Sequence, residues 1–450
     1  MQVIHIDPTS SKKIAEIIEA KAYGNIDVVI DEVSLDSRLN MKNCVFFAIE
    51  GKQYDGNSYI ENAIENGAKL IVTSKEPTLK FGVSIMVVND TKKALGLLSK
   101  ALKGQEKIVG ITGSVGKTTV KDMTKLVLGE KYSVNSTENN YNNEIGVPLT
   151  LFKGKNCDFN VIEMGMRGLG EIEWLSYISD PEISIITNVG SSHLERLKNK
   201  DNVFRAKTEI IKHTKKIAIL PNENEFHSLD YGTLTPLFIG KGGDCFIDKI
   251  YSNGEMTAFD VSFKGELIHG IELNSISEHM AHNALFAISV GKICGIGNED
   301  IRKSLKKYKG REMREEISQI GELTIINDCY NASYESMVAS IKSAKNFGKI
   351  HRKNVIAVLG DMLELGEYSK EFHYRIGELS RDLGIKNIYA TGEFGGCILD
   401  GFFGGEYFED KNQIATALIN SLNGDEVVLF KASRGIHLDT VITQMKELLK

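Results

Sequence analysis

The chain has 450 residues, a length that predicts about three domains. Its hydrophobic content of 42% and charged content of 25% argue against a disordered chain or a fibre. The net charge of −6 argues against a large nucleic-acid-binding surface and allows a local basic pocket for a phosphorylated ligand.

Residues 1–102 alternate strand and helix patterns and predict a small α/β domain. The expected strands are 28–30, 45–49, 70–72 and 85–88, with a helix at 59–66. A polar cluster containing Ser34, Asp36, Ser37 and Arg38 follows the first of these strands. Its guanidinium and hydroxyls could hold a diphosphate or a sugar, and a turn with a solvated charge is the simpler alternative.

The second segment, 103–312, follows an amphipathic helix pattern at 91–102 and contains a polar break at its start, at 104–106. Near-continuous apolar runs at 159–163, 183–189 and 217–220 are typical of strands in a parallel sheet covered by helices on both faces. A strand-rich stretch at 244–275 follows, and a helix is expected from 277 to 293.

Residues 110–119 read Gly-Ile-Thr-Gly-Ser-Val-Gly-Lys-Thr-Thr, between an apolar strand and a helical pattern. The N–H groups of such a turn and the dipole of the following helix form a cradle for phosphate oxygens. Lys117 would reach the terminal phosphates, and Thr118 would offer its hydroxyl to Mg²⁺. The strict phosphate-loop pattern requires glycine at the position of Ile111. The alternative interpretation of residues 110–119 is therefore an ordinary glycine turn at the start of a helix.

Polar residues gather beyond the other strands of this segment. Glu163 ends a strand, where a phosphate-loop ATPase keeps the acid that completes its magnesium site. His193 follows the next strand, at the sheet edge where α/β proteins bind ligands, although a lone loop histidine is usually solvent-exposed. The amides of 139–143 predict a turn or a ligand-gripping loop. Lys207 lies on an expected helix, and its spacing alone predicts a surface lysine.

The third segment, 313–450, repeats the α/β pattern and predicts a Rossmann-like sheet. Its expected strands are 323–328, 354–361, 387–392 and 426–431. No Gly-x-Gly-x-x-Gly follows the first of them, so dinucleotide binding is not indicated. The loops 328–336 and 432–435 should share one sheet edge and could face the second segment.

Neither a targeting signal nor a cysteine framework stands out in the sequence. The N-terminus lacks the basic start and apolar run of a signal peptide, and no stretch has the apolar length to span a bilayer. The six cysteines are scattered, without a Cys-x-x-Cys pair. We expect a cytoplasmic protein with reduced thiols, no membrane insertion and no nucleic-acid partner, and nothing demands more than a monomer.

Together these motifs resemble those of the Mur ligases, ATP-dependent amide-forming enzymes of bacterial cell-wall synthesis. The similarity runs over the whole chain. Its longest motifs are 139–148, 327–333, 359–366 and 431–435. Within the family the chain is most similar to the enzymes that join D-alanyl-D-alanine to UDP-N-acetylmuramoyl-tripeptide. The resemblance implies a UDP-sugar domain at 1–102, a central ATPase domain at 103–312 and a Rossmann-like ligase domain at 313–450.

The resemblance also implies the cofactors and the site residues. The implied cofactors are ATP and two Mg²⁺ ions, with Lys207 carbamylated. The implied catalytic residues are Lys117, Glu163, His193 and Lys207, and the implied metal set is Thr118, Glu163, His193 and Lys207. The implied ATP-binding residues are Gly113, Ser114, Val115, Gly116, Lys117, Thr118, Thr119, Asn283, Arg311 and Asp328. The implied substrate-binding residues are Ser34, Asp36, Ser37, Arg38, Asn142, Asn143, Asn331, Ser433 and Arg434.

Two other functions stay open at this point. One is another amino-acid-adding Mur-type ligase or a folylpolyglutamate-synthase-like enzyme, which would use a different acceptor or amine. The other is a nucleotide-gated switch or binding module. A GTPase switch should carry Asn-Lys-x-Asp, and the nearest stretch, residues 199–202, has its acid one place early. The sequence does not distinguish lysine from diaminopimelate at the third position of the peptide substrate.

Overall fold

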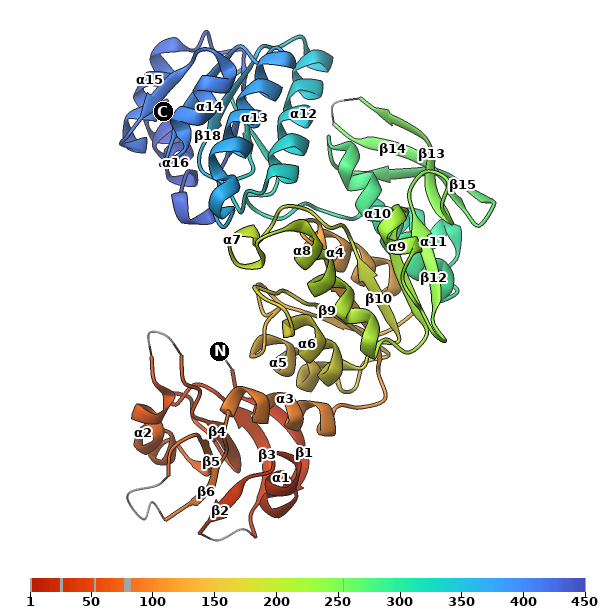
Figure 1. The fold of residues 1–450 in the computed structure, drawn as a ribbon, viewed down its shortest axis with the longest axis vertical. Helices are drawn as coiled ribbons and strands as arrows, with labels where there is room; N and C mark the ends of the chain where they lie inside the picture. The colour runs from red at the N-terminus through yellow and green to blue at the C-terminus, as the bar shows by residue number, and fades with distance from the viewer. Residues whose placement is uncertain (1, 25–26, 52–53, 77–81, 254, 450) are drawn as a thin grey trace.

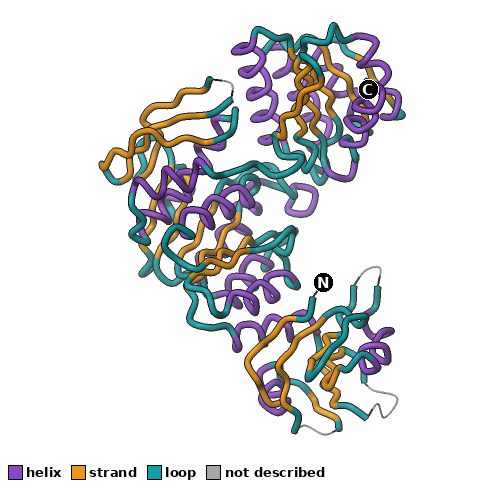
Figure 2. The backbone as a smooth tube through the Cα atoms, turned by 180° about the vertical axis from the view of Figure 1, so that it is seen from behind, coloured by secondary structure: helices purple, strands orange, loops and turns teal. Residues whose placement is uncertain are grey.

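The fold is a mixed α/β architecture with three sheets, each in a lobe of its own (Figure 1). The computed structural model describes residues 2–24, 27–51, 54–76, 82–253 and 255–449. Most neighbouring strands within the sheets are parallel, so the expected fold class is confirmed. Figure 2 shows the same three lobes from behind, with a group of strands projecting from the middle lobe at the upper left.

The first sheet has the strand order β1-β3-β4-β5-β6-β2, with a parallel centre and antiparallel edge strands. Its strands are β1 (Ile4–Ser10), β2 (Lys21–Tyr23), β3 (Val29–Ser34), β4 (Cys44–Phe47), β5 (Ala68–Thr73) and β6 (Ser84–Val87). Its helices are α1 (Ser11–Ile17), α2 (Ile60–Glu65) and α3 (Thr91–Leu102). The apolar faces of α1 and α3 pack on the face of β4 that carries Val45 and Phe47. Cys44 and Phe46, on the opposite face, pack in a second cluster with Ala63 of α2, so β4 is buried on both faces.

The central sheet has the order β15-β14-β13-β12-β11-β10-β7-β9-β8, and only its β13 to β15 end is antiparallel. Its strands are β7 (Lys107–Thr112), β8 (Val134–Ser136), β9 (Phe159–Glu163), β10 (Ile183–Ile186), β11 (Ile217–Pro221), β12 (Thr235–Ile239), β13 (Cys245–Ser252), β14 (Thr257–Phe263) and β15 (Glu266–Leu273). Its helices are α4 (Lys117–Leu128), α5 (Gly146–Gly154), α6 (Glu171–Ser179), α7 (Leu194–Leu197), α8 (Lys200–Thr208), α9 (Asn224–His227), α10 (Glu278–Ile293) and α11 (Asn298–Lys306). Leu149 and Phe152 of α5 reach the core of the first sheet.

The third sheet has the order β16-β17-β21-β18-β19-β20 and is parallel except for its β16 edge. Its strands are β16 (Glu316–Ile320), β17 (Leu323–Asn327), β18 (Val355–Leu359), β19 (Asn387–Thr391), β20 (Glu406–Phe408) and β21 (Val427–Lys431). Its helices are α12 (Tyr334–His351), α13 (Ser369–Asp382), α14 (Gly395–Phe402), α15 (Ile414–Ser421) and α16 (Asp439–Leu448). Parallel strands need long crossovers, and α12 to α15 supply them, whereas α16 follows the last strand.

The strand register of the central sheet brings its loops to a common edge. Ile111 of β7 pairs with Glu163 of β9, and Thr112 pairs with Ile186 of β10. The carboxyl ends of these three strands therefore lie side by side, at the edge where open α/β sheets hold ligands. Within the described residues, no helix has the length and apolar character to cross a membrane.

Candidate active site

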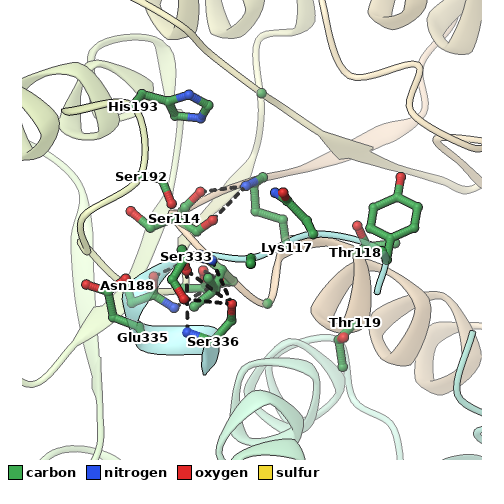
Figure 3. Close-up of a pocket in the computed structure, with 18 of the residues that line it drawn as sticks. Ser114, Lys117, Thr118, Thr119, Asn188, Ser192, His193, Ser333, Glu335 and Ser336 are labelled. Carbon is green, nitrogen blue, oxygen red and sulfur yellow. Dashed lines mark hydrogen bonds between the residues drawn. The ribbon is translucent and has the colours of Figure 1, made fainter. Parts of the chain in front are cut away.

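A cavity of about 950 Å³ lies between the central and third sheets. Figure 3 shows side chains from both sides of it: Ser114, Lys117 and His193 from the central lobe, and Ser333, Glu335 and Ser336 from the C-terminal lobe. Seventeen of the sequence-predicted site residues line it. They are Gly113, Ser114, Val115, Gly116, Lys117, Thr118, Thr119, Asn142, Asn143, Glu163, His193, Lys207, Asn283, Asp328, Asn331, Ser433 and Arg434.

The loop between β7 and α4 has the backbone that a phosphate cradle requires. Gly113 and Gly116 have φ values of 149° and 83°, in the region that favours glycine. A Cβ at Gly116 would also lie 2.6 Å from Asn283 Oδ1 on α10. The chain therefore needs glycine at both positions to turn from strand into helix, and the amino terminus of α4 faces the cavity.

Lys117 bends back over its own loop. Its Nζ donates to the carbonyl oxygens of Gly113 at 2.7 Å and Ser114 at 3.2 Å. Burial lowers the pKa of Lys117, the charge of Glu163 opposes this shift, and the charge of Arg314 adds to it. An anionic ligand would replace these neutral carbonyl acceptors with charged ones, which form stronger hydrogen bonds with an ammonium group.

Glu163 ends β9 with one carboxylate oxygen engaged and the other free. Its Oε1 accepts a hydrogen bond from Asn142 Nδ2 at 2.8 Å. Its Oε2 is buried and has no hydrogen-bond partner in the described part of the chain. A buried carboxylate oxygen without a donor fits a cation. Over the described residues, however, no three His, Cys, Asp or Glu side chains form a metal cluster.

Lys207 on α8 is buried, with a relative exposure of 1%. Its neighbours Val203 and Ala206 are buried as well, so this face of α8 turns towards the core and the sequence-based prediction of a surface lysine is wrong. Across the residues that the structure describes, its Nζ makes no hydrogen bond or ion pair. Burial, with the charge of Lys117 as a smaller cause, lowers the pKa of Lys207 well below its usual value. Burial therefore favours the neutral amine of Lys207 more than water would.

His193 is the N-cap residue of α7, has a left-handed backbone and contacts a carboxylate of the other lobe. Its Nδ1 lies 2.5 Å from Oε2 of Glu364, which follows β18. Hydrogen bonding to His193 lowers the pKa of Glu364. The imidazole thus lines the cavity while paired with the C-terminal domain, a partner that the sequence does not indicate.

Two arginines in the segment between α11 and β16 point in different directions. Arg311, expected at the ATP phosphates, does not line the cavity and instead pairs with Asp122 on α4, at 2.5 and 2.8 Å. Arg314, which sequence reasoning missed, lines the cavity and donates to Thr118 Oγ1 at 3.3 Å. Its guanidinium also lies 4.2 Å from the ring centroid of Tyr330. The only indication in the sequence was that a second arginine, Arg314, follows Arg311 by three residues in the same segment.

The C-terminal residues of the cavity are held by contacts between loops. Asp328, after β17, pairs with the buried Lys431 at 2.6 Å, and Lys431 also donates to the carbonyl of Asn331. Ser433 Oγ accepts the N–H of Leu363 at 3.0 Å. Arg434 lies 3.4 Å from Asp439. The loops after β17, β18 and β21 therefore form one connected wall, as their shared sheet edge predicts.

Asn142 and Asn143, expected to bind substrate, have partners within the protein. Asn142 holds Glu163, as described above. Asn143 Oδ1 accepts the N–H groups of Ile145 and Gly146 at 3.1 and 2.9 Å and so caps the start of α5. Both residues line the cavity, and both side chains are already hydrogen-bonded to groups of the protein.

The polar cluster after β3 does not line this cavity and lies in the first lobe. Arg38 binds Asp36 through two hydrogen bonds of 2.8 and 2.7 Å, which lowers the pKa of Asp36 to about 2. Ser34 Oγ accepts the N–H of Asp36 at 3.1 Å, and Ser37 is buried. The cluster is a preformed polar turn with an exposed guanidinium.

Comparison with known proteins gives consistent matches along the chain. Three family models match it in succession: "Mur ligase family, catalytic domain" at residues 29–103, "Mur ligase middle domain" at 111–291 and "Mur ligase, glutamate ligase domain" at 313–434. The UDP-N-acetylmuramoyl-tripeptide--D-alanyl-D-alanine ligase of Bacillus subtilis is 33% identical, over 97% of this chain and 98% of that relative.

Solved structures match over similar lengths. A crystal structure of MurF from Acinetobacter baumannii has a TM-score of 0.91 and 27% identity, over 99% of this chain and 100% of that one. The structure of MurF ligase from Thermotoga maritima in complex with ADP has a TM-score of 0.83 and 28% identity, over 93% and 97% of the two chains.

Proposed function

The chain belongs to the Mur ligase family, and we propose that it joins D-alanyl-D-alanine to UDP-N-acetylmuramoyl-tripeptide at the expense of ATP, in peptidoglycan precursor synthesis. The observation that carries this proposal is the cavity in which the phosphate loop faces the loops of the C-terminal lobe. Activation of a carboxylate by ATP and its capture by an amine require both groups at one place, because proximity lowers the entropic cost of reaction.

The reaction has two steps. In the first, the terminal carboxylate of the tripeptide attacks the γ-phosphorus of ATP, the bond to the bridging oxygen breaks, and an acyl phosphate and ADP form. In the second, the free amine of the dipeptide attacks the acyl carbon and loses a proton, and the tetrahedral intermediate expels inorganic phosphate. Two anions must approach each other in the first step, so the site has to supply positive charge.

Two side chains of this site supply that charge. We assign Lys117 to the terminal phosphates, which it reaches by leaving the carbonyl oxygens of its own loop. We assign Arg314, and not Arg311, to the same phosphates, because Arg314 lines the cavity beside Thr118. Asn283 is assigned to the adenine base and Asp328 to the ribose. The proposed adenosine site thus extends from Gly116 along α10 to the facing end of β17.

The residues present also fit Mg²⁺, which would neutralise charge on the phosphate oxygens. The unpartnered oxygen of Glu163 and the hydroxyl of Thr118 supply two ligands of the type that Mg²⁺ prefers, and we add His193 and Lys207 to this set. We further propose that Lys207 is carbamylated. Its buried neutral amine attacks the carbon of CO₂, an N–C bond forms, and one proton leaves to solvent. The product is an anion that complements the site's cations.

The remaining substrate contacts divide between the lobes. We propose that 1–102 bind the UDP-sugar, that 103–312 bind ATP and that 313–450 bind the dipeptide. The proposed UDP-sugar contacts are Ser34, Asp36, Ser37 and Arg38. The proposed peptide contacts are Asn142, Asn143, Asn331, Ser433 and Arg434. We also propose that the enzyme acts as a monomer in the cytoplasm, where its nucleotide-linked substrates would be available.

An ADP-release assay with purified protein tests this proposal. Release of ADP should require ATP, Mg²⁺, the UDP-tripeptide and D-alanyl-D-alanine together, and omission of any one should reduce it to background. The assay is run with lysine-containing and diaminopimelate-containing tripeptides and with folate and glutamate as alternative substrates. Turnover with the folate pair, or with a single amino acid in place of the dipeptide, would assign the chain to another ligase of this fold.

A further inference from the structure

The first turn of α12 carries a carboxylate that the proposed reaction does not use. Ser333 is the N-cap of α12 and forms a capping box with Ser336, so the turn that carries Glu335 is well fixed. A carboxylate at this position is also stabilised by the positive end of the helix dipole. Glu335 therefore presents a fixed negative charge to the central lobe (Figure 3).

Both oxygens of Glu335 are engaged by Ser191, which lies in the loop after β10. Oε1 accepts the backbone N–H of Ser191 at 2.8 Å, and Oε2 accepts its hydroxyl at 2.9 Å. A Cβ at Gly190 would lie 2.6 Å from the carboxyl carbon of Glu335, so this close approach requires glycine. Within the described residues no cation pairs with Glu335, so its hydrogen-bond partners at this point are the two donors of Ser191.

The same loop is bonded to the phosphate loop. The N–H of Gly190 donates to Ser114 Oγ at 2.8 Å. Asn188 accepts the N–H of Ser114 through its backbone carbonyl at 3.1 Å and the N–H of Val115 through Oδ1 at 3.0 Å. Hydrogen bonds and the covalent backbone of residues 188–191 therefore connect Glu335 of the C-terminal lobe to the phosphate loop, which we assign to ATP.

We propose that Glu335 is a positioning residue for the nucleotide: its carboxylate holds residues 188–191, and these hold the phosphate loop in the shape that accepts ATP. The inference rests on the proposed function only in that the nucleotide is ATP. It adds a residue to which the proposed reaction assigns no contact with a substrate. Docking of the C-terminal lobe and affinity for the nucleotide are then coupled, and each strengthens the other to the same extent.

Calorimetric titration with a non-hydrolysable ATP analogue and Mg²⁺, without peptide substrates, tests this coupling. Glu335→Ala should weaken binding about tenfold, the loss expected for a charge-assisted hydrogen bond. Glu335→Gln should bind within about twofold of wild type, because its amide can accept the Ser191 N–H and donate to its hydroxyl. Glu371→Ala, an exposed glutamate on α13, serves as the control and should bind normally.

Two further variants separate positioning from general damage. Gly190→Ala displaces the carboxylate sterically and should reproduce the loss of Glu335→Ala. Ser191→Ala combined with Glu335→Ala should be no weaker than Glu335→Ala alone, because both act through one contact. Binding within twofold of wild type by Glu335→Ala, or losses that add in the double variant, would overturn the positioning role. A protein that binds the analogue but forms no amide would instead refute the proposed function and leave this test intact.

Discussion

The phosphate loop and the segment from Gly310 to Glu315 both contribute residues to the lining of the same cavity, but they are built in opposite ways. In the phosphate loop, consecutive residues share one turn, and two glycines with positive φ determine where each N–H and side chain lies. In the second segment, Arg311 is held by Asp122 while Arg314, three residues later, reaches Thr118. The position of a side chain can therefore be predicted from sequence where the local backbone determines it, as in the phosphate loop. It cannot be predicted in this way where contacts with distant residues determine it, as for the two arginines.

The largest expected effect concerns the phosphate loop itself. Lys117→Ala should lower the rate of ADP release about a thousandfold, because no other side chain of this loop brings a cation to the terminal phosphates. The rate is measured at saturating peptide substrates. Lys125→Ala, at an exposed position on the same helix α4, is the matched control and should retain full activity. Activity of Lys117→Ala within tenfold of wild type would contradict the role of this lysine.

The second largest loss of activity is expected at Lys207, whose burial depends on tertiary packing and not on the local backbone. Lys207→Ala should lose about a hundredfold in turnover, and a small added carboxylate such as acetate should restore part of it by replacing the carbamate. Lys200→Ala, exposed at the start of the same helix, should be unaffected. Normal turnover by Lys207→Ala, or no response to acetate, would contradict the proposed carbamylation of Lys207.

The two arginines test the comparison directly. Arg314→Ala should raise the KM for ATP about tenfold, corresponding to about 1.4 kcal/mol, because it removes a cation that lines the cavity. Arg311→Ala should change the KM for ATP less than twofold and act mainly on stability, since its partner is Asp122. Steady-state kinetics and thermal unfolding distinguish these effects. The reverse pattern would restore the expectation drawn from sequence.

The smallest effect concerns His373, which supports the C-terminal wall of the cavity. Its buried Nε2 accepts the N–H of Met362 at 2.9 Å, and burial lowers its pKa below the usual 6.5. The folded state favours the neutral imidazole. The contribution of His373 to the free energy of unfolding is therefore present above pH 6.5 and is lost as the pH falls below this value. The thermal midpoint should fall by about 2 °C more between pH 7.5 and 5.5 in wild type than in His373→Gln.

The solvent-exposed His5 provides the control for this measurement. His5→Gln should retain the wild-type dependence of the midpoint on pH. An equal dependence in wild type and His373→Gln would show that the buried imidazole has no part in it.

The sequence predicted much of this molecule because the relevant signals are local. Continuous apolar runs identified β9 and β21, whose residues are buried along the whole strand. The helix expected at 91–102 matches α3. Glu163 could be placed in the site because a strand end next to a phosphate loop has a predictable position in a parallel sheet.

The rest depends on contacts between residues far apart in the chain. Helical spacing placed Lys207 at the surface, but the core around Val203 and Ala206 buries it. The pairing of His193 with Glu364 and of Ser191 with Glu335 joins two lobes, and no periodicity within either segment indicates it. Sequence patterns report which faces are apolar, whereas these pairs depend on how two folded lobes meet.

The stoichiometry of the complete reaction tests the proposed ligase activity most directly. ADP and the amide product are quantified together, by a coupled assay and by mass spectrometry, after reaction with the UDP-tripeptide and D-alanyl-D-alanine. The proposed reaction gives one ADP for each UDP-linked pentapeptide, and no sustained ADP release is expected when the dipeptide is left out. Sustained ADP release that is indifferent to the dipeptide would contradict it.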